Sequence, residues 1–257
     1  RASVNIAYGK VQGAYDHRTT DAVLAAGEPL ELVLEGLTGD MRYYYRLYFQ
    51  TSGGTGSGPT EEYTFHTARP AGSTFTFCIQ SDSHTEREDE FNRDLYTRTL
   101  LTAAADKPDF YLTLGDDFGI DNLATPTVNH AQVIERYAIQ RPFLGLIGHS
   151  APVFLVNGNH EQAARYLLNG TPNNVAVWAQ NARNTHYSQP APDGFYSGNS
   201  EEIRFIGLLR NYYAWTWGDA LFVVIDPYWA STVYGDNPFG STKVLRTHLW
   251  NVTHGNA

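Results

Sequence analysis

The stretch VFLVNGNHEQ, residues 153–162, decides the fold class of this chain. Four apolar residues run directly into Asn-Gly at 157–158 and then into Asn-His-Glu at 159–161. The apolar run is typical of a buried strand, and Asn-Gly is typical of a turn. A turn explains residues 157–158, but the three polar side chains that follow gain nothing from burial at the end of a strand, so they indicate a site.

Two earlier strands are predicted to end in the same way. TFTFCIQ, residues 74–80, is followed by Ser-Asp-Ser-His at 81–84, and DFYLTL, residues 109–114, is followed by Gly-Asp-Asp at 115–117. Helical patterns at 89–105 and 130–147 separate the three strands. Alternating strands and helices predict a parallel sheet with crossover helices, and loops after parallel strands share one edge. We therefore expect the three polar clusters to converge.

Composition excludes several classes of protein. The 257 residues carry a formal net charge of −9, which argues against a nucleic-acid-binding surface. The sequence contains no apolar run of roughly 18 residues, so no membrane-spanning helix is predicted. The single cysteine, Cys78, can form neither an internal disulfide nor a thiolate metal site. Its apolar context favours a small buried hydrophobe. The sequence makes no prediction of the oligomeric state.

The chain falls into two styles of sequence. Residues 1–69 combine Tyr-rich strand patterns with a Gly/Ser turn cluster at 51–60, which predicts a β sandwich followed by a linker at 69–72. Residues 73–257 form the predicted α/β domain. Within it, residues 165–205 are expected to be irregular, and residues 212–226 to form a hairpin turning at Gly218-Asp219.

The polar clusters offer nitrogen and oxygen ligands. Aspartate, asparagine and histidine without thiolate suit Mn, Fe or Zn. A carboxylate on the middle loop, Asp116, is placed to bridge two ions. Two metals about 3.5–4 Å apart can clamp a phosphoryl group for in-line attack.

The motifs D-x-H (Asp82-Ser83-His84), G-D (Gly115-Asp116) and G-N-H-E (158–161), each after a strand and in this order, resemble the calcineurin-like metallophosphoesterase superfamily. The amino-terminal part resembles the fibronectin-III-like domain that precedes the catalytic domain in purple acid phosphatases and alkaline phosphatase D-type enzymes. The resemblance implies a β sandwich followed by an αββα domain. It also implies a secreted or periplasmic enzyme that hydrolyses small phosphate esters with a metal-bound hydroxide.

The resemblance further implies two transition metals, Fe, Mn or Zn, and a role for each residue of the motifs. The expected roles are the first metal for Asp82 and His84, the bridge for Asp116, the second metal and a phosphate oxygen for Asn159, transition-state stabilisation or proton donation for His160, and orientation of neighbours for Glu161. Asp117 and Asp121 are expected to be solvated loop acids.

The chain also departs from the family. Purple acid phosphatases carry tyrosine at the position of Gly119 and glycine at the position of His84, so no tyrosinate–iron colour is expected. The later histidine and the G-H-x-H pair of the family are missing, and His248 and His254 do not form such a pair. We therefore expect a fragment of a longer enzyme, with a partial sandwich and an incomplete catalytic domain.

Two alternatives remain open at this point. The chain could be a catalytically degenerate module that binds a phosphorylated or glycan ligand without turnover. The aromatic side chains between residues 186 and 217 could line a substrate pocket, with Tyr187 and Tyr196 as the better candidates, or they could pack the core and the hairpin.

Overall fold

The computed structural model describes residues 1–54, 56–120, 123, 127–158, 160–161 and 169–226. Within them lie three helices and fourteen strands. In chain order the elements are β1 (Ala2–Gly9), β2 (His17–Arg18), β3 (Ala22–Leu24), β4 (Arg42–Thr51), β5 (Ser57–Pro59), β6 (Tyr63–His66), β7 (Phe77–Gln80), α1 (Arg93–Ala105), β8 (Phe110–Thr113), α2 (His130–Gly148), β9 (Val153–Leu155), α3 (Val175–His186), β10 (Ser197–Gly198), β11 (Glu202–Ile203), β12 (Gly207–Leu208), β13 (Tyr213–Trp217) and β14 (Ala220–Val224).

The predicted parallel sheet is confirmed. β7, β8 and β9 pair in parallel in that order, with Ile79 opposite Leu112 and Leu112 opposite Phe154. α1 and α2 are the two crossover helices, and each begins at an asparagine whose side chain accepts a backbone N–H of the first turn. The carboxyl ends of the three strands therefore lie at one edge, as the spacing of the motifs predicts.

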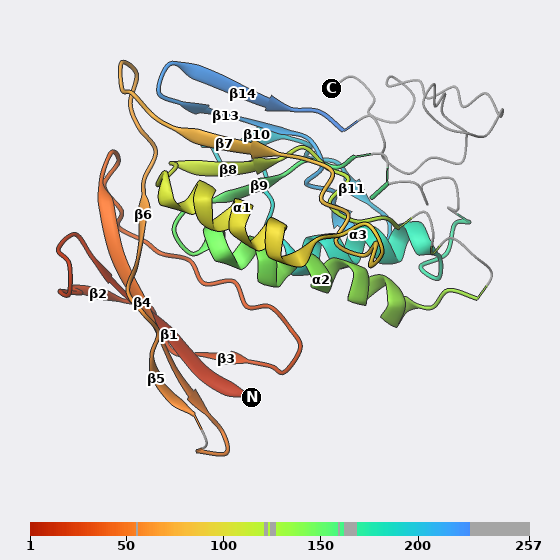
Figure 1. Ribbon diagram of the computed structural model, residues 1–257, viewed down its shortest axis with the longest axis horizontal. Helices are drawn as coiled ribbons and strands as arrows, with labels where there is room; N and C mark the ends of the chain where they lie inside the picture. The colour runs from red at the N-terminus through yellow and green to blue at the C-terminus, as the bar shows by residue number, and fades with distance from the viewer. Residues whose placement is uncertain (55, 121–122, 124–126, 159, 162–168, 227–257) are drawn as a thin grey trace.

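The sheet is covered on both faces (Figure 1). The helices cover one face, where residues such as Leu100 and Tyr137 form a buried core and half-buried Cys78 packs against it. The β13–β14 hairpin covers the other face, and Phe154 of β9 stacks on Trp215 with ring centroids 4.2 Å apart. The hairpin turns at 218–219, as predicted. The described layers are thus helix, sheet and sheet; the fourth layer of the αββα arrangement stays a prediction.

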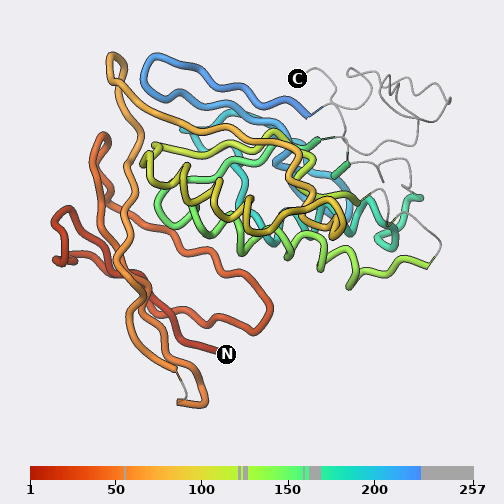
Figure 2. Tube along the Cα trace, in the orientation of Figure 1, coloured from red at the N-terminus to blue at the C-terminus, as the bar shows by residue number. Residues whose placement is uncertain are grey.

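The amino-terminal strands form one antiparallel sheet of six strands, β1–β6 (Figure 2). A sandwich needs a second sheet facing the first, and the described residues of this part contain a single sheet, so the fibronectin-III-like sandwich and its boundary stay predictions. The sheet contacts the α/β part of the chain through His149 at the end of α2. The Tyr45 hydroxyl donates to the His149 carbonyl at 2.6 Å, and Tyr63 stacks on the His149 ring.

The expectation that residues 165–205 are irregular is wrong at α3. Its sequence, VAVWAQNARNTH, is rich in β-branched residues and asparagine, which favour helix weakly. Tertiary contacts hold it instead. Arg183 is buried and donates to the carbonyls of Leu155 and Arg210, which lie on two other segments.

The pocket hypothesis fails for Tyr187, which is buried in the helical core and donates its hydroxyl to the Tyr137 carbonyl. Tyr196 packs against the second core beside Phe154. The packing interpretation of the aromatic stretch is therefore the better one. In the described part of the chain, no helix has the length and apolar character needed to cross a bilayer.

Candidate metal centre

The loops that follow β7 and β8 run side by side. The backbone N–H groups of Asp82, His84 and Thr85 donate to the carbonyls of residues 115, 116 and 117 at 3.0, 3.3 and 3.2 Å. These bonds extend the pairing of the two strands beyond their ends. They fix the position of the D-x-H segment relative to the G-D segment.

The loops after β8 and β9 meet at two glycines. A Cβ on Gly115 would lie 2.1 Å from the Gly158 nitrogen, and a Cβ on Gly158 would lie 2.1 Å from Oδ1 of Asp116. Gly115 also has a positive φ of 95°. Only glycine at both positions allows the backbones to approach this closely, which explains the glycine in G-D and the glycine in G-N-H-E.

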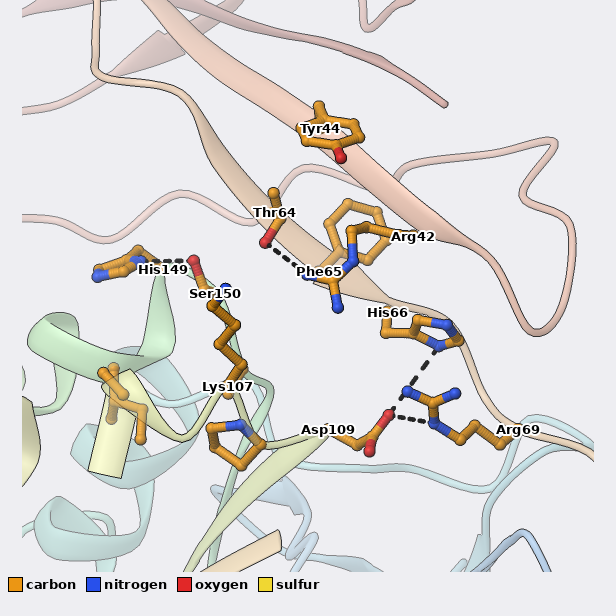
Figure 3. Close-up of a pocket in the computed structure, with 14 residues that line it drawn as sticks. Arg42, Tyr44, Thr64, Phe65, His66, Arg69, Lys107, Asp109, His149 and Ser150 are labelled. Carbon is orange, nitrogen blue, oxygen red and sulfur yellow. Dashed lines mark hydrogen bonds and ion pairs between the residues drawn. The ribbon is translucent and has the colours of Figure 1, made fainter. Parts of the chain in front are cut away.

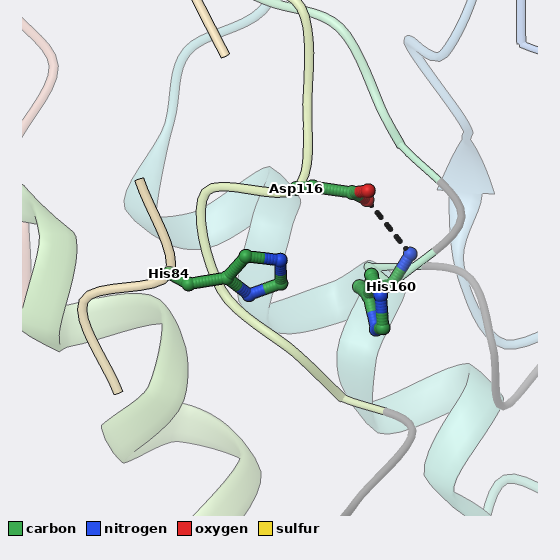
Figure 4. A group of neighbouring side chains, drawn as sticks. All are labelled: His84, Asp116 and His160. Atoms are coloured by element: carbon green, nitrogen blue, oxygen red, sulfur yellow. Dashed lines mark hydrogen bonds between the residues drawn. The ribbon is translucent and has the colours of Figure 1, made fainter. Parts of the chain in front are cut away.

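Three of the predicted site residues come together at this edge. His84, Asp116 and His160 each place a ligand atom within 4.8 Å of the other two, and all three side chains are half-buried (Figure 4). The imidazole rings are 4.8 Å apart and nearly perpendicular. The His160 backbone N–H donates to Oδ1 of Asp116 at 3.0 Å. Each residue comes from a different strand end, as the parallel topology requires.

This donor set fits a transition metal. Two imidazoles and a carboxylate are common ligands of Zn, Mn and Fe. An ion held at about 2.1 Å by each ligand separates two ligand atoms by at most about 4.2 Å, and the 4.8 Å spread of this cluster is close to that limit. Among the described residues, no other group of three such side chains gathers within this distance.

One predicted ligand, Asp82, is not part of this cluster. Asp82 is exposed, and its Oδ2 accepts the Ser81 hydroxyl at 2.5 Å. It is anchored next to the centre by its backbone, but its carboxylate does not join His84, Asp116 and His160. Asn159 lies outside the described residues. The roles implied for Asp82 and Asn159, and the second metal that depends on them, stay predictions.

The backbone is strained at the centre. Asp82, His84 and Asp116 have φ values of 56°, 42° and 54°, in the left-handed region that non-glycine residues rarely occupy. Such a conformation costs on the order of 1 kcal/mol per residue and persists where the surroundings enforce it. The loop bonds described above do so, and strain of this kind clusters at functional sites.

Glu161 ties the second and third loops together. Its buried carboxylate accepts the backbone N–H groups of Asp116, Asp117 and Gly158 at 3.0, 2.7 and 2.8 Å. This agrees with the orienting role that the resemblance implies. Burial raises the pKa of the Glu161 carboxyl, and the charges of Asp117 and Asp116 add to the rise, whereas its backbone donors act in the opposite direction.

The expectation of a solvated Asp117 is wrong. The side chain is 1% exposed, and it accepts the Ser83 hydroxyl at 3.1 Å and the Gln140 amide at 3.4 Å. Burial raises the pKa of the Asp117 carboxyl. The sequence could not show this, because the burying partner is on α2, 23 residues away. Asp121 lies outside the described residues.

A further acid at this edge was not predicted. Asp226 follows β14, is completely buried, and accepts the Asn157 side-chain amide at 2.9 Å. Asn157 precedes the G-N-H-E segment, so this bond joins the hairpin layer to the site loop. The only signal in the sequence is an aspartate directly after the apolar run LFVVI.

A separate hollow of about 440 Å³ lies between the amino-terminal sheet and the opposite edge of the parallel sheet (Figure 3). Its basic side chains include Arg69 and His66, which face Asp109 at 2.5 and 4.0 Å. Ligands of parallel α/β sheets bind at the carboxyl edge. We therefore place the functional site at His84, Asp116 and His160.

Comparison with known protein families identifies the class of this chain. The model of the calcineurin-like phosphoesterase family matches residues 75–248, which is more than half of the chain and includes all three loops. A search of curated proteins finds no match. With the parallel sheet, the three loops and this match together, the chain belongs to the calcineurin-like phosphoesterase family.

Proposed function

We propose that this protein is a metal-dependent hydrolase of phosphoric esters that acts on small phosphate-ester substrates. The observation that carries the proposal is the convergence of His84, Asp116 and His160 at the carboxyl edge of the parallel sheet. Family membership supports the same reaction class. A transition metal bound at this centre would supply positive charge to the phosphoryl oxygens and would lower the pKa of a bound water.

Each residue of the cluster has a proposed task. His84 and Asp116 would hold the metal through a ring nitrogen and a carboxylate oxygen. Oδ1 of Asp116 accepts the His160 backbone N–H and lies close to Gly158, so the carboxylate is fixed before any ligand arrives. Preorganisation of this kind lowers the cost of binding.

His160 is proposed to donate a proton from its imidazole to the oxygen of the leaving alcohol. The ring lies beside His84 and Asp116, the two residues that would hold the metal, and its centroid is 4.8 Å from that of His84. Proton transfer by a positioned histidine contributes about 10²–10⁴-fold to a rate. Asn159 and Asp82 are proposed as further ligands, on the basis of the family motifs alone.

The proposal is tested by loading the purified chain with Mn, Zn or Fe and measuring hydrolysis of p-nitrophenyl phosphate and bis-p-nitrophenyl phosphate. We expect turnover that depends on the metal and falls about 100-fold or more in Asp116→Asn. Asp94→Asn, on the exposed first turn of α1, is the matched control and should keep full activity.

The same experiment contains the result that overturns the proposal. If the chain binds metal and inorganic phosphate but hydrolyses neither ester, the binding-module alternative replaces the hydrolase. Equal turnover in Asp116→Asn and wild type would instead show that the activity does not arise at this centre.

A further inference from the structure

A buried carboxylate that belongs to none of the family motifs lies next to the centre. Glu86 is two residues after His84, and its side chain is 1% exposed. Its Oε1 is 3.2 Å from Nδ1 of His84 and accepts the Gly119 backbone N–H at 2.8 Å. Arg87 places its Nε 3.8 Å from the same oxygen, and its side chain is partly exposed.

Burial of the Glu86 carboxylate in this environment costs free energy. The other carboxylate oxygen, Oε2, is buried and has no hydrogen-bond partner in the described part of the chain. A buried carboxylate with an unmatched oxygen costs free energy, because water would satisfy that oxygen in the unfolded chain. A glutamate at this position therefore calls for an explanation other than stability.

The contact between Glu86 and His84 supplies such an explanation. When a carboxylate accepts from Nδ1, that nitrogen carries the proton and Nε2 keeps its lone pair. Nδ1 of His84 faces Glu86, so Nε2 is the nitrogen left to turn toward Asp116 and His160 (Figure 4). Metal-bound histidines in proteins are commonly held by a carboxylate in this way, which fixes the ring and raises its basicity.

The hydrogen bond from the Gly119 backbone N–H fixes the position of the Glu86 carboxylate. Glu86 is anchored to the loop after β8, the loop that also carries Asp116. One carboxylate thus sets the position of the His84 ring relative to Asp116. The backbone bond from His84 to the Asp116 carbonyl, at 3.3 Å, sets the position of the main chain.

We propose that Glu86 is a positioning residue for the metal centre: it holds the proton of His84 on Nδ1 and directs Nε2 toward the site shared with Asp116 and His160. The proposal rests on the proposed function only in naming the metal as the ligand. The ring orientation itself exists without metal and can be tested without it.

The first test reads the tautomer of His84 in the metal-free protein by long-range ¹H–¹⁵N NMR at a pH where the ring is neutral. We expect the proton on Nδ1 in wild type and in Glu86→Gln, whose amide oxygen still accepts. We expect the Nε2-protonated form to gain population in Glu86→Ala. A wild-type His84 protonated mainly on Nε2 would overturn the proposal, whatever the activity of the protein.

The second test measures zinc affinity by competition with a chelating dye. Loss of a carboxylate behind a metal-bound histidine typically weakens binding about 10–100-fold. We expect zinc binding to weaken about 10-fold in Glu86→Gln, which loses the negative charge. We expect it to weaken up to about 100-fold in Glu86→Ala, which also loses the acceptor that keeps the proton of His84 on Nδ1. Glu90→Gln, an exposed acid that contacts Arg87 on the same segment, should change the affinity less than 2-fold as our matched control.

The tautomer of His84 and the zinc affinity together distinguish the positioning role of Glu86 from the metal centre of the proposed function. Nδ1 protonation together with undetectable zinc binding would uphold the positioning of His84 and reject the metal centre of the proposed function. Zinc affinities that are equal in the Glu86 variants and in Glu90→Gln would reject the positioning role even if the enzyme is active. Unfolding midpoints of all variants show which losses arise from misfolding.

Discussion

Oδ1 of Asp116 lies against the α-carbon of Gly158, so closely that a methyl group on residue 158 would be 2.1 Å from it. The carboxylate of Asp116 therefore packs directly on Gly158 of the next loop, with no room for a side chain between them. Because the same oxygen also accepts the His160 backbone N–H, the carboxylate cannot move aside without losing that bond.

Gly158→Ala should therefore damage both the fold and the site. We expect a loss of about 1–3 kcal/mol in the free energy of unfolding, as for overpacked cores, and weaker zinc binding. Urea unfolding and dye competition measure the two effects. Gly145→Ala is the matched control: residue 145 is in α2 with open space around its α-carbon, and the change should stabilise the helix by about 0.5–1 kcal/mol. A Gly158→Ala variant as stable as wild type would contradict the close approach.

Glu161→Gln tests the link between the second and third loops. An amide group turns one oxygen into a donor, which then faces backbone N–H groups, so at least one of the three bonds is lost. We expect a loss of about 1–3 kcal/mol of unfolding free energy and faster hydrogen exchange at residues 116, 117 and 158. The exposed Glu135 of α2, changed to glutamine, should leave both measurements unchanged. Protection of those three amides in the variant would argue against the link.

His160→Asn separates proton donation from metal binding. If His160 acts as the acid, the variant keeps its metal and loses about 10²–10⁴-fold in turnover of an alkyl phosphate, with a smaller loss for p-nitrophenyl phosphate, whose leaving group needs less protonation. Metal content by elemental analysis and the two turnover rates decide this. His130→Asn, on the exposed start of α2, serves as the control. Loss of the metal in His160→Asn would make His160 a ligand instead.

His186 should make stability depend on pH. It is 6% exposed, burial and the charge of Arg141 lower its pKa, and its Nδ1 has no hydrogen-bond partner in the described part of the chain. The folded pKa lies below the unfolded value of about 6.5, so the unfolded chain binds the proton first on acidification. The stabilisation is complete above about pH 6.5 and is lost as the pH falls through that value toward the lowered pKa.

The check on His186 is the difference in unfolding free energy between wild type and His186→Asn, measured from pH 8 to pH 5. The difference should change sharply below about pH 6.5, to the disadvantage of wild type. A constant difference for His186→Asn would show that its neutral form is not favoured by the fold.

The strands and loops of the site could be predicted from the sequence because their signals are local. Each apolar run of the parallel sheet ends at its own polar cluster, and the segments between the runs carry a helical pattern. The convergence of His84, Asp116 and His160 then follows from topology. The family match confirms the superfamily that the three motifs indicate.

The remaining features depend on contacts between distant segments. α3 forms although its sequence favours helix weakly, because Arg183 and its apolar neighbours are buried against other elements. Asp117 is an ordinary loop acid until Gln140 of α2 covers it. Glu86 stands in a run of charged residues, 86–90, that reads as a solvated turn, and only the structure shows its carboxylate turned inward to His84 and Gly119.

The left-handed backbones of Asp82, His84 and Asp116 bear on how such a protein changes over generations. Glycine would relieve the strain at each position by about 1 kcal/mol, so a lineage freed from selection for chemistry gains stability by losing these side chains. A saturation library sorted only for folding should therefore enrich glycine at residues 82, 84 and 116. The extent of that enrichment measures how much stability the chain gives up to keep its reactive groups in place.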